Sequence, residues 1–239
     1  TLRAPWRIGI DVGGTFTDLM LADSAGATHV AKVPSVPSDP SLGVLAALER
    51  LAADFGTSVQ KILADCALFV HGSTVATNTM LEGKGAKVGL LTTKGFRDAL
   101  ELRRGLREDQ WNHRAPYAPV LVPRYRRLGI GGRIDSDGSE HEPLNVGDID
   151  QALETFAEEG VEAIAIGFFN SFVNPEHEAA AEAAIRERWD GEWVSPSATL
   201  SPMMGEYERT STAVVNAYLS SRIVAYLRKL DGELRGLGL

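Results

Sequence analysis

The sequence predicts an α/β protein whose mixed sheet opens with a β-hairpin. Two apolar runs flank the Gly13-Gly14 pair, an arrangement typical of antiparallel strands joined by a tight turn. Residues 40–55 then carry apolar side chains at helical spacing, and residues 65–71 form an apolar strand. From about residue 143, helix and strand patterns alternate, which indicates parallel strands joined by right-handed crossovers.

The hairpin turn combines several groups that suit phosphate. It reads Asp-x-Gly-Gly-Thr-x-Thr-Asp, beginning at Asp11. Gly13 and Gly14 lack a Cβ, so they can take positive φ and let a ligand approach the backbone. Successive N–H groups in such a turn form a concave nest for phosphate oxygens, and Thr15 and Thr17 add hydroxyl donors. Asp11 is a carboxylate placed to hold a divalent cation through water, as Mg²⁺ prefers.

The alternative is an ordinary hairpin with polar residues near its turn. A bare Gly-Gly pair would favour that alternative, whereas a carboxylate, a nest and two hydroxyls within one turn favour a phosphate site. The motif lacks the Gly-Lys-Ser/Thr of a Walker A loop, and it is not a Gly-x-Gly-x-x-Gly fingerprint.

Composition excludes several classes of protein. The chain has 239 residues, 44% of them hydrophobic, enough for one large domain or two small ones. A formal net charge of −8 gives the whole chain no nucleic-acid signature. No apolar stretch is long enough to span a membrane, and no signal peptide is visible. Cys66 is the single cysteine, which excludes intrachain disulfides and favours a reducing, cytoplasmic compartment. Its apolar neighbours predict core packing in a buried strand and no role as a nucleophile.

Arginines are concentrated between Arg97 and Arg133, where nine of them accompany four acidic residues. A solvated surface, an anion site and a partner interface all fit this composition. We favour an anion site or a partner interface, because arginine suits planar, bidentate contacts.

A polar cluster follows the apolar strand, in residues 71–85. Ser73 is placed to cap a short helix, on which Thr77 and Asn78 lie on neighbouring faces with Thr74 before them. The beginning of a helix beyond the carboxyl end of a buried strand suits an anion or a polarised carbonyl. An ordinary helix cap is the alternative, and His71 alone is equally typical of a hydrogen-bonded structural histidine.

The remaining elements follow in order. Residues 27–33 predict a third antiparallel strand, and Asp39 followed by Pro40 predicts the start of the first helix. Glu206 and Arg209 lie three residues apart on a long helix near the end of the chain, where they can pair across one turn. The other predicted elements are strands at 86–93, 125–134, 161–168 and 193–194 and helices at 94–102, 149–157 and 175–189. We divide the chain into residues 1–140, an α/β unit at 141–202 and the long helix at 203–239.

Three motifs together resemble a known family. Residues 6–22, residues 71–104 and the run from Met204 to Tyr218 resemble the N-terminal half of the hydantoinase/oxoprolinase large subunit. That family includes ATP-dependent hydantoinases, 5-oxoprolinase, caprolactamase-type enzymes and the acetone and acetophenone carboxylases. The resemblance implies the first lobe of an actin/hexokinase/Hsp70-like ATPase fold, with a second α/β unit.

The resemblance also implies a reaction, in which ATP with Mg²⁺ phosphorylates the carbonyl oxygen of a hydantoin, 5-oxoproline or lactam before hydrolysis. Ketone carboxylation is the first alternative, and a sugar-type kinase or a non-catalytic assembly subunit of the same fold is the second. Asp11 would orient the metal, with Asp18 and His71 as further catalytic residues. The residues expected at the phosphates are Gly13, Gly14, Thr15, Phe16 and Thr17. Those expected on the substrate side are Ser73, Thr74, Thr77, Asn78, Arg103, Arg104, Glu206 and Arg209.

The resembled fold closes two lobes on ATP. No second phosphate loop or adenosine pocket is visible before Leu239, so we expect either a fragment of a longer protein or a second polypeptide that completes the cleft. A second, hydantoinase-B-like subunit in a hetero-oligomer is the partner that the resemblance implies.

Overall fold

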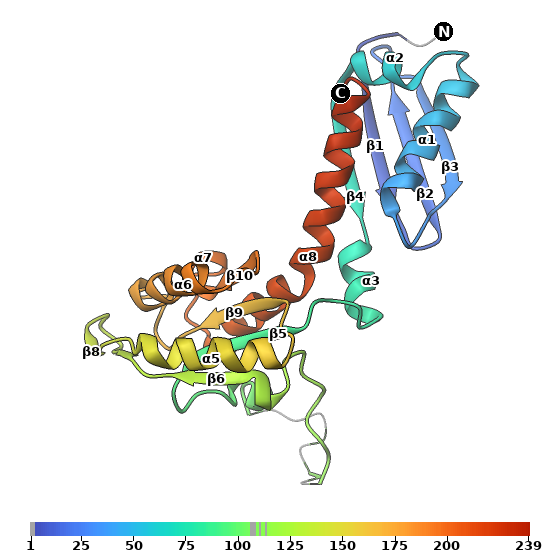
Figure 1. Ribbon diagram of the computed structural model, residues 1–239. Helices are drawn as coiled ribbons and strands as arrows, with labels where there is room; N and C mark the ends of the chain where they lie inside the picture. The colour runs from blue at the N-terminus through green and yellow to red at the C-terminus, as the bar shows by residue number, and fades with distance from the viewer. Residues whose placement is uncertain (1–2, 106–108, 110, 113) are drawn as a thin grey trace. The chain divides into compact units, whose positions relative to one another are not determined.

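The computed structural model describes residues 3–105, 109, 111–112 and 114–239 (Figure 1). The chain forms two compact units: unit 1 comprises residues 1–84 and 222–239, and unit 2 comprises residues 85–221. The boundary therefore falls near residue 85 and not near residue 140 as expected. The long helix α8 (Glu206–Gly236) contributes its first residues to unit 2 and its last residues to unit 1.

Unit 1 contains the predicted hairpin. Strands β1 (Trp6–Val12), β2 (Phe16–Ala22) and β3 (Thr28–Pro34) pair antiparallel in sequence order, and β4 (Cys66–Ser73) pairs parallel with β1. The sheet order is β3-β2-β1-β4. Because β1 and β4 are parallel, both end at the same edge of the sheet, where the glycine pair follows β1.

Helices cover one face of this sheet. Helix α1 (Pro40–Asp54) begins after Asp39 with proline in its first turn, as predicted, whereas the short α2 (Val59–Ala64) has no counterpart in the sequence analysis. Helix α3 (Val75–Leu81) follows β4. The covered face forms a core whose members include Ile8, Ile10, Leu19, Leu48 and Leu51, with Tyr226, Leu230 and Leu234 from α8.

The other face of the sheet is open among the described residues. Met20, Val30 and Val70 are each more than half exposed, and they lie in one row because Met20 pairs with Val30 and Gly9, which in turn pairs with Val70. The expected buried strand is therefore an edge strand with one exposed face. Cys66 is only half-buried, although burial raises the pKa of its thiol, which opposes the thiolate that a nucleophile needs.

Unit 2 is a parallel sheet in the order β10-β9-β5-β6. Its strands are β5 (Val88–Thr93), β6 (Arg127–Ile130), β9 (Ala163–Gly167) and β10 (Trp193–Pro196). The strand predicted at 86–93 is thus the centre of a second sheet. Helices α5 (Val146–Glu158) and α6 (Glu176–Arg188) pack on one face through a core that includes Phe156, Ile164, Ile166 and Ile185.

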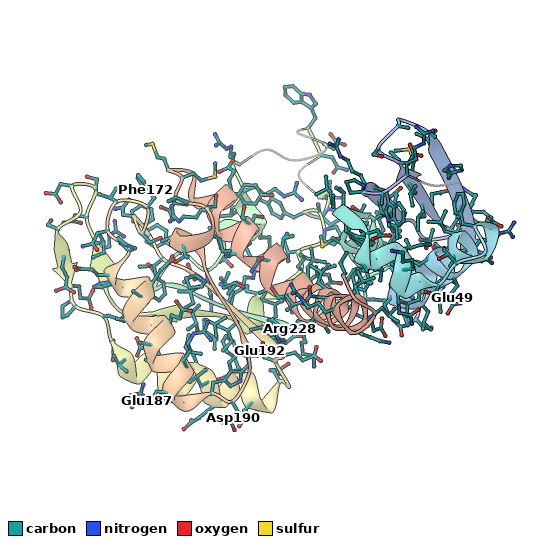
Figure 2. The ribbon with its side chains drawn as sticks, turned by 90° about the horizontal axis from the view of Figure 1, so that it is seen from above. Glu49, Phe172, Glu187, Asp190, Glu192 and Arg228 are labelled. Carbon is teal, nitrogen blue, oxygen red and sulfur yellow. The ribbon has the colours of Figure 1, made fainter. Side chains whose placement is uncertain are left out.

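Short elements complete unit 2. They are α4 (Ala99–Leu102), the 3-10 helix η1 (Arg124–Arg126), α7 (Ser197–Leu200) and the hairpin strands β7 (Arg133–Ile134) and β8 (Glu140–Glu142). The β7–β8 turn is at Gly138, with φ of 87°. Figure 2 shows Glu187, in the last turn of α6, and Asp190, just after this helix, at one end of unit 2. Phe172 lies at the other end, in the loop that leads into α6.

Candidate functional site

The candidate site is the edge of unit 1 where β1 and β4 end. Val12 pairs with Ser73 at the last position of the parallel ladder, so the glycine turn and the start of α3 are neighbours. Asp11, Gly14 and Thr15 are exposed here. The structure therefore brings the expected metal ligand and part of the expected phosphate turn to the same surface.

Gly13 and Gly14 are needed because a Cβ would not fit at either position easily, and not because either residue has positive φ. Neither Gly13 nor Gly14 has positive φ, so the expected nest conformation is not adopted. The Gly13 N–H donates to the Phe16 carbonyl oxygen at 3.0 Å, and a Cβ on Gly13 would lie 3.0 Å from that oxygen. A Cβ on Gly14 would lie 3.1 Å from Nδ2 of Asn78. Within the described residues the Gly14 and Thr15 amides donate to no protein acceptor, so both remain available to a ligand.

Two carboxylates lie next to each other on the open face of the sheet. Asp11 and Asp18 are directly opposite across the β1–β2 pair, so their side chains share one face. Lys32 neutralises Asp18 from β3 at 2.8 Å. The Asp11 carboxylate has no ion pair within the described part of the chain, and its neighbour on β4 is the bare Gly72, whose Cβ position lies 3.5 Å from Oδ1 of Asp11.

Thr17 and Phe16 lie on opposite faces of β2, so one is buried and the other is exposed. Thr17 is fully buried, and its Oγ1 is 2.9 Å from Oγ of Ser35, so its hydroxyl belongs to the packing between β2 and the chain leading into α1. Alternation along a strand explains this, because Thr17 points to the face opposite Asp18. Phe16 is 45% exposed and lies under the Lys32 ammonium at 4.8 Å.

Hydrogen bonds connect the start of α3 to the end of β1. The Thr74 N–H donates to the Val12 carbonyl oxygen at 3.1 Å, and Nδ2 of Asn78 donates to Oγ1 of Thr74 at 3.3 Å. The N-cap position is Thr74, although Oγ of Ser73 accepts from the Val75 N–H at 3.1 Å, much as a capping side chain would. Ser73, Thr74 and Asn78 thus adjoin the turn, and Thr77 is exposed on the helix that follows.

His71 faces the helical side of the sheet. Its Nε2 lies 2.5 Å from the Tyr226 hydroxyl on α8. Burial lowers the pKa of His71, and burial raises the pKa of Tyr226 to about 12. The imidazole is therefore neutral near pH 7, and its hydrogen bond with the Tyr226 hydroxyl ties β4 to α8.

A cavity of about 690 Å³ opens beside the turn, within unit 1. The residues that frame it include Gly13, Gly14, Pro40, Asn78, Arg222 and Tyr226. Its volume lies within the range of small-molecule sites. Local sequence patterns do not indicate this cavity, because its α8 wall is some two hundred residues from the hairpin in the chain.

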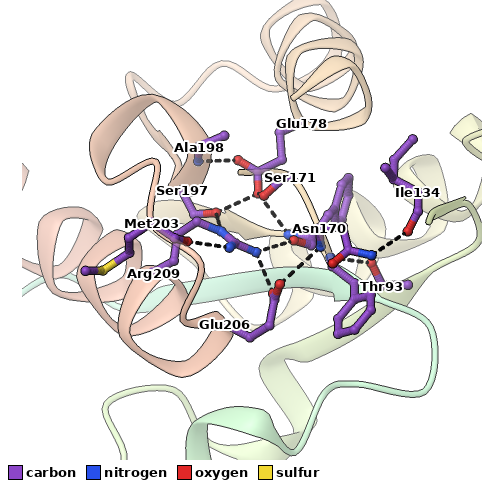
Figure 3. Close-up of polar contacts among 12 residues, drawn as sticks. Thr93, Ile134, Asn170, Ser171, Glu178, Ser197, Ala198, Met203, Glu206 and Arg209 are labelled. Atoms are coloured by element: carbon purple, nitrogen blue, oxygen red, sulfur yellow. Dashed lines mark hydrogen bonds and ion pairs between the residues drawn. The ribbon is translucent and has the colours of Figure 1, made fainter. Parts of the chain in front are cut away.

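The remaining expected substrate residues lie in unit 2. Arg209 is fully buried: Nε donates to Oγ of Ser197, Nη1 to the Met203 carbonyl oxygen, and Nη2 to the Phe168 carbonyl oxygen and to Glu206. Figure 3 shows this network. The second Glu206 oxygen accepts from the Asn170 N–H at 3.1 Å. We therefore propose a structural role for Glu206 and Arg209 in place of the expected substrate contact.

Glu178 is the member of this network that the sequence analysis missed. It is almost fully buried, and it accepts hydrogen bonds from the Phe168 and Ala198 N–H groups and from the Ser171 and Ser197 hydroxyls. A glutamate in an alanine-rich helix gives no sequence signal of burial, because surface helices have the same composition.

Several arginines of the rich segment are structural. Arg127 is fully buried and donates to Glu101 at 2.7 Å and to the Arg97 carbonyl oxygen. Arg124 pairs with Asp98 and holds the pKa of that carboxyl below its ordinary value. Arg104 pairs with Glu208, and Arg103 adopts positive φ of 54°. Residues 106–108, 110 and 113 of this segment lie outside the described residues.

Within the part of the chain that the structure describes, no group of three or more His, Cys, Asp or Glu side chains is arranged to hold a metal ion. None of the described helices combines the length and apolar character that crossing a bilayer requires.

Comparison with known proteins identifies relatives over the whole chain. The family described as the hydantoinase/oxoprolinase N-terminal region matches residues 7–189. The caprolactamase subunit alpha of Pseudomonas jessenii is 45% identical over 99% of this chain and 34% of its own length. The acetophenone carboxylase gamma subunit of Aromatoleum aromaticum is 37% identical over 97% of this chain and 33% of its own length.

Solved structures of such relatives superpose on this chain. The crystal structure of the ATP-dependent caprolactamase from Pseudomonas jessenii superposes with a TM-score of 0.89 at 44% identity, covering 97% of this chain and 34% of that one. A nucleotide-free acetone carboxylase superposes with a TM-score of 0.89 at 28% identity, covering 99% of this chain and 35% of that one. The chain thus spans about a third of the length of these relatives.

Proposed function

The chain belongs to the hydantoinase/oxoprolinase N-terminal family, and from that membership we propose that it supplies the phosphate-binding part of an ATP-dependent enzyme. The proposed reaction activates the carbonyl of a cyclic amide by phosphorylation before hydrolysis. Support for amide chemistry comes from caprolactamase subunit alpha, at 45% identity. The expectation of a second subunit also stays a proposal, supported by relatives that are named as subunits.

One observation carries the proposal: the Asp11 carboxylate has no ion pair within the described residues, and the Gly14 and Thr15 N–H groups of the same turn donate to no protein acceptor there. Asp18, one strand away, is paired with Lys32, whereas the Asp11 carboxylate lies beside Gly72. Mg²⁺ is commonly bound through one or two carboxylates together with the phosphates of a nucleotide, and Asp11 fits that donor set. The Gly14 and Thr15 N–H groups are placed to donate to phosphate oxygens.

Phosphoryl transfer depends mainly on positioning and charge neutralisation. Bound Mg²⁺ would neutralise charge on the phosphates. The amides of the turn would fix the terminal phosphate. Because Gly14 has no Cβ, the side chain of Asn78 can lie close to the backbone of the turn. In the proposed step the amide oxygen bonds to the γ-phosphorus while the β–γ bridging bond breaks, and ADP leaves with that electron pair. Water then opens the activated ring and releases phosphate.

Ketone carboxylation is the second candidate. It is supported by the 37% identity to an acetophenone carboxylase subunit and by the superposition on acetone carboxylase. A requirement for bicarbonate in ATP turnover separates it from amide hydrolysis. Phosphate left on an alcohol would indicate a kinase, and no ATP turnover with any acceptor would indicate an assembly subunit.

The test exchanges the free carboxylate for an amide in the complete enzyme. Asp11→Asn should lower ATP turnover by about 10²-fold or more, as loss of a key electrostatic group does. Asp18→Asn is the matched control, because the carboxylate it removes lies directly opposite and is already paired with Lys32. We expect its effect on ATP turnover to be at least about tenfold smaller, since the charge it removes is already neutralised.

Nucleotide binding is measured alongside turnover, by titration with a non-hydrolysable ATP analogue in the presence of Mg²⁺. Weaker analogue binding in Asp11→Asn than in Asp18→Asn supports the assignment. Wild-type turnover in Asp11→Asn, or equal losses in the two variants, would refute the metal role of Asp11.

A further inference from the structure

Gly9 is a strand glycine whose open side has no neighbour among the described residues. It lies in β1, an inner strand of the unit 1 sheet, between β2 and β4. A Cβ at Gly9 would meet nothing within 4 Å. Glycine weakens the interior of a strand, because it loses more conformational freedom on folding than other residues and has no side chain to pack. Such a glycine often marks a place where a ligand or another backbone approaches closely.

Two strand glycines of unit 2 show this use. A Cβ on Gly89 would lie 2.6 Å from the ring of Phe156 on α5, and a Cβ on Gly167 would lie 2.7 Å from Oγ1 of Thr210 on α8. In both places the bare strand lets a side chain of a helix come close to the strand backbone. Gly9 offers the same access, and no described helix uses it.

Gly9 is the centre of an apolar row across the open face of the unit 1 sheet. It pairs with Met20 on β2 and with Val70 on β4, and Met20 pairs with Val30 on β3. Met20, Val70 and Val30 are 51%, 53% and 69% exposed. The two strands that flank β1 are roughly 10 Å apart, so a helix can approach Gly9 between Met20 and Val70. We call Val70, Gly9, Met20 and Val30 the Gly9 row.

A helix is the element that suits this row. Helices α1 and α8 already pack on the opposite face, through a core that includes Leu48 and Leu230. An apolar sheet face is buried against a further layer of structure, and in α/β proteins that layer is helical. The next residue of β1 on the open face is Asp11, so an element that covers the Gly9 row also adjoins the candidate site.

The relatives indicate where such a helix comes from. The match to this chain takes up 34% of caprolactamase subunit alpha and 33% of the acetophenone carboxylase gamma subunit, so about two thirds of each relative lies outside it. A tethered segment has a high effective concentration at the sheet, so it can keep an apolar face covered.

We propose that the Gly9 row receives an apolar helix of the same, longer polypeptide, from outside these 239 residues, and that Gly9 is bare so that this helix can approach β1. The proposal goes beyond the proposed function and does not depend on the binding of ATP.

The test measures whether position 20 is covered. Met20→Cys, which keeps an apolar side chain there, is made in a Cys66→Ser background. It is made in this 239-residue chain, whose units each have a core, and in the complete polypeptide purified without any second subunit. The rate of maleimide labelling at position 20 is followed by peptide mass spectrometry. Glu49→Cys is the matched control, because Glu49 is exposed on α1, on the helical side of the sheet.

We expect labelling at position 20 to be roughly tenfold slower or more in the complete polypeptide than in the 239-residue chain, because it then requires local opening. Labelling at position 49 should be similar in both. Adding Gly9→Leu should restore fast labelling at position 20 in the complete polypeptide, since the new side chain fills the space that the helix needs. In the 239-residue chain Gly9→Leu meets open space, so labelling should stay fast and the circular dichroism spectrum should not change.

Four results would overturn the proposal. They are equally fast labelling of position 20 in both proteins, protection that survives Gly9→Leu, protection that appears only when a second subunit is added, and protection of the 239-residue chain alone at high concentration. The third result would assign the Gly9 row to that subunit, and the fourth would assign it to a second copy of this chain.

Discussion

At the scale of single residues, His71 makes a contact that links two elements of unit 1. Its ring is hydrogen-bonded to the Tyr226 hydroxyl in a half-buried contact, and its catalytic role stays a prediction. Burial lowers the pKa of His71 from its ordinary value of 6.5. Below that pH the unfolded chain binds a proton at His71 that the folded chain does not bind. The free energy of unfolding therefore falls as the pH falls.

This linkage gives a testable pH dependence. The unfolding midpoint of the wild type in urea should decrease as the pH is lowered from 7.5 to 5.5. His71→Gln keeps an acceptor for the phenol and removes the titration, so its midpoint should fall less steeply over the same range. Tyr226→Phe is the control, because it removes the hydrogen bond and leaves the imidazole to titrate. Parallel slopes for wild type and His71→Gln would contradict the linkage.

At the scale of elements, a glycine fixes how closely α1 approaches β2. A Cβ on Gly43 would lie 2.6 Å from Oγ1 of the buried Thr17, so the helix contacts the strand through a bare backbone. Gly43→Ala must displace the Thr17 hydroxyl from Ser35 or shift α1. We expect a loss of about 1–3 kcal/mol in the free energy of unfolding, as overpacking costs.

Gly232 of α8 provides the opposite case. It is exposed, and a Cβ there would meet nothing within 4 Å. Gly232→Ala should stabilise by about 0.5–1 kcal/mol, because alanine is the better helix former. Urea unfolding measures both variants. Equal effects of the two substitutions would show that contact between α1 and β2 is not what Gly43 provides.

Element positions were largely predictable, whereas burial was not. The hairpin, α1 and the alternating elements of unit 2 follow local periodicity and turn chemistry. Periodicity does not indicate which sheet a strand joins, so the sequence division groups β5 with the hairpin in residues 1–140, whereas it belongs to unit 2. An apolar run also has the same pattern in a central strand and in the edge strand β4. The polar site was partly predicted: Asp11 and the turn are exposed, but strand alternation buries Thr17.

At the scale of the whole molecule, each unit has its own hydrophobic core. The unit 1 core is built on β1, β2, α1 and α8, and the unit 2 core on β5, β9, α5 and α6. Separate cores permit separate stabilities, because local unfolding follows contiguous cooperative units. The buried network around Glu178 and Arg209 belongs to unit 2 alone.

Glu178→Gln tests this separation. The carboxylate accepts four hydrogen bonds, and an amide replaces one of its two oxygens with an NH2 group that faces at least one of those donors, so we expect a loss of about 3 kcal/mol or more in the free energy of unfolding. Glu182→Gln on the same helix removes only the pair with Arg186, which we expect to cost about 0.5 kcal/mol. In hydrogen exchange, Glu178→Gln should lose protection in β5 and β9 and keep it in β1 and β2. Equal loss in all four strands would mean that the two cores unfold as one cooperative unit.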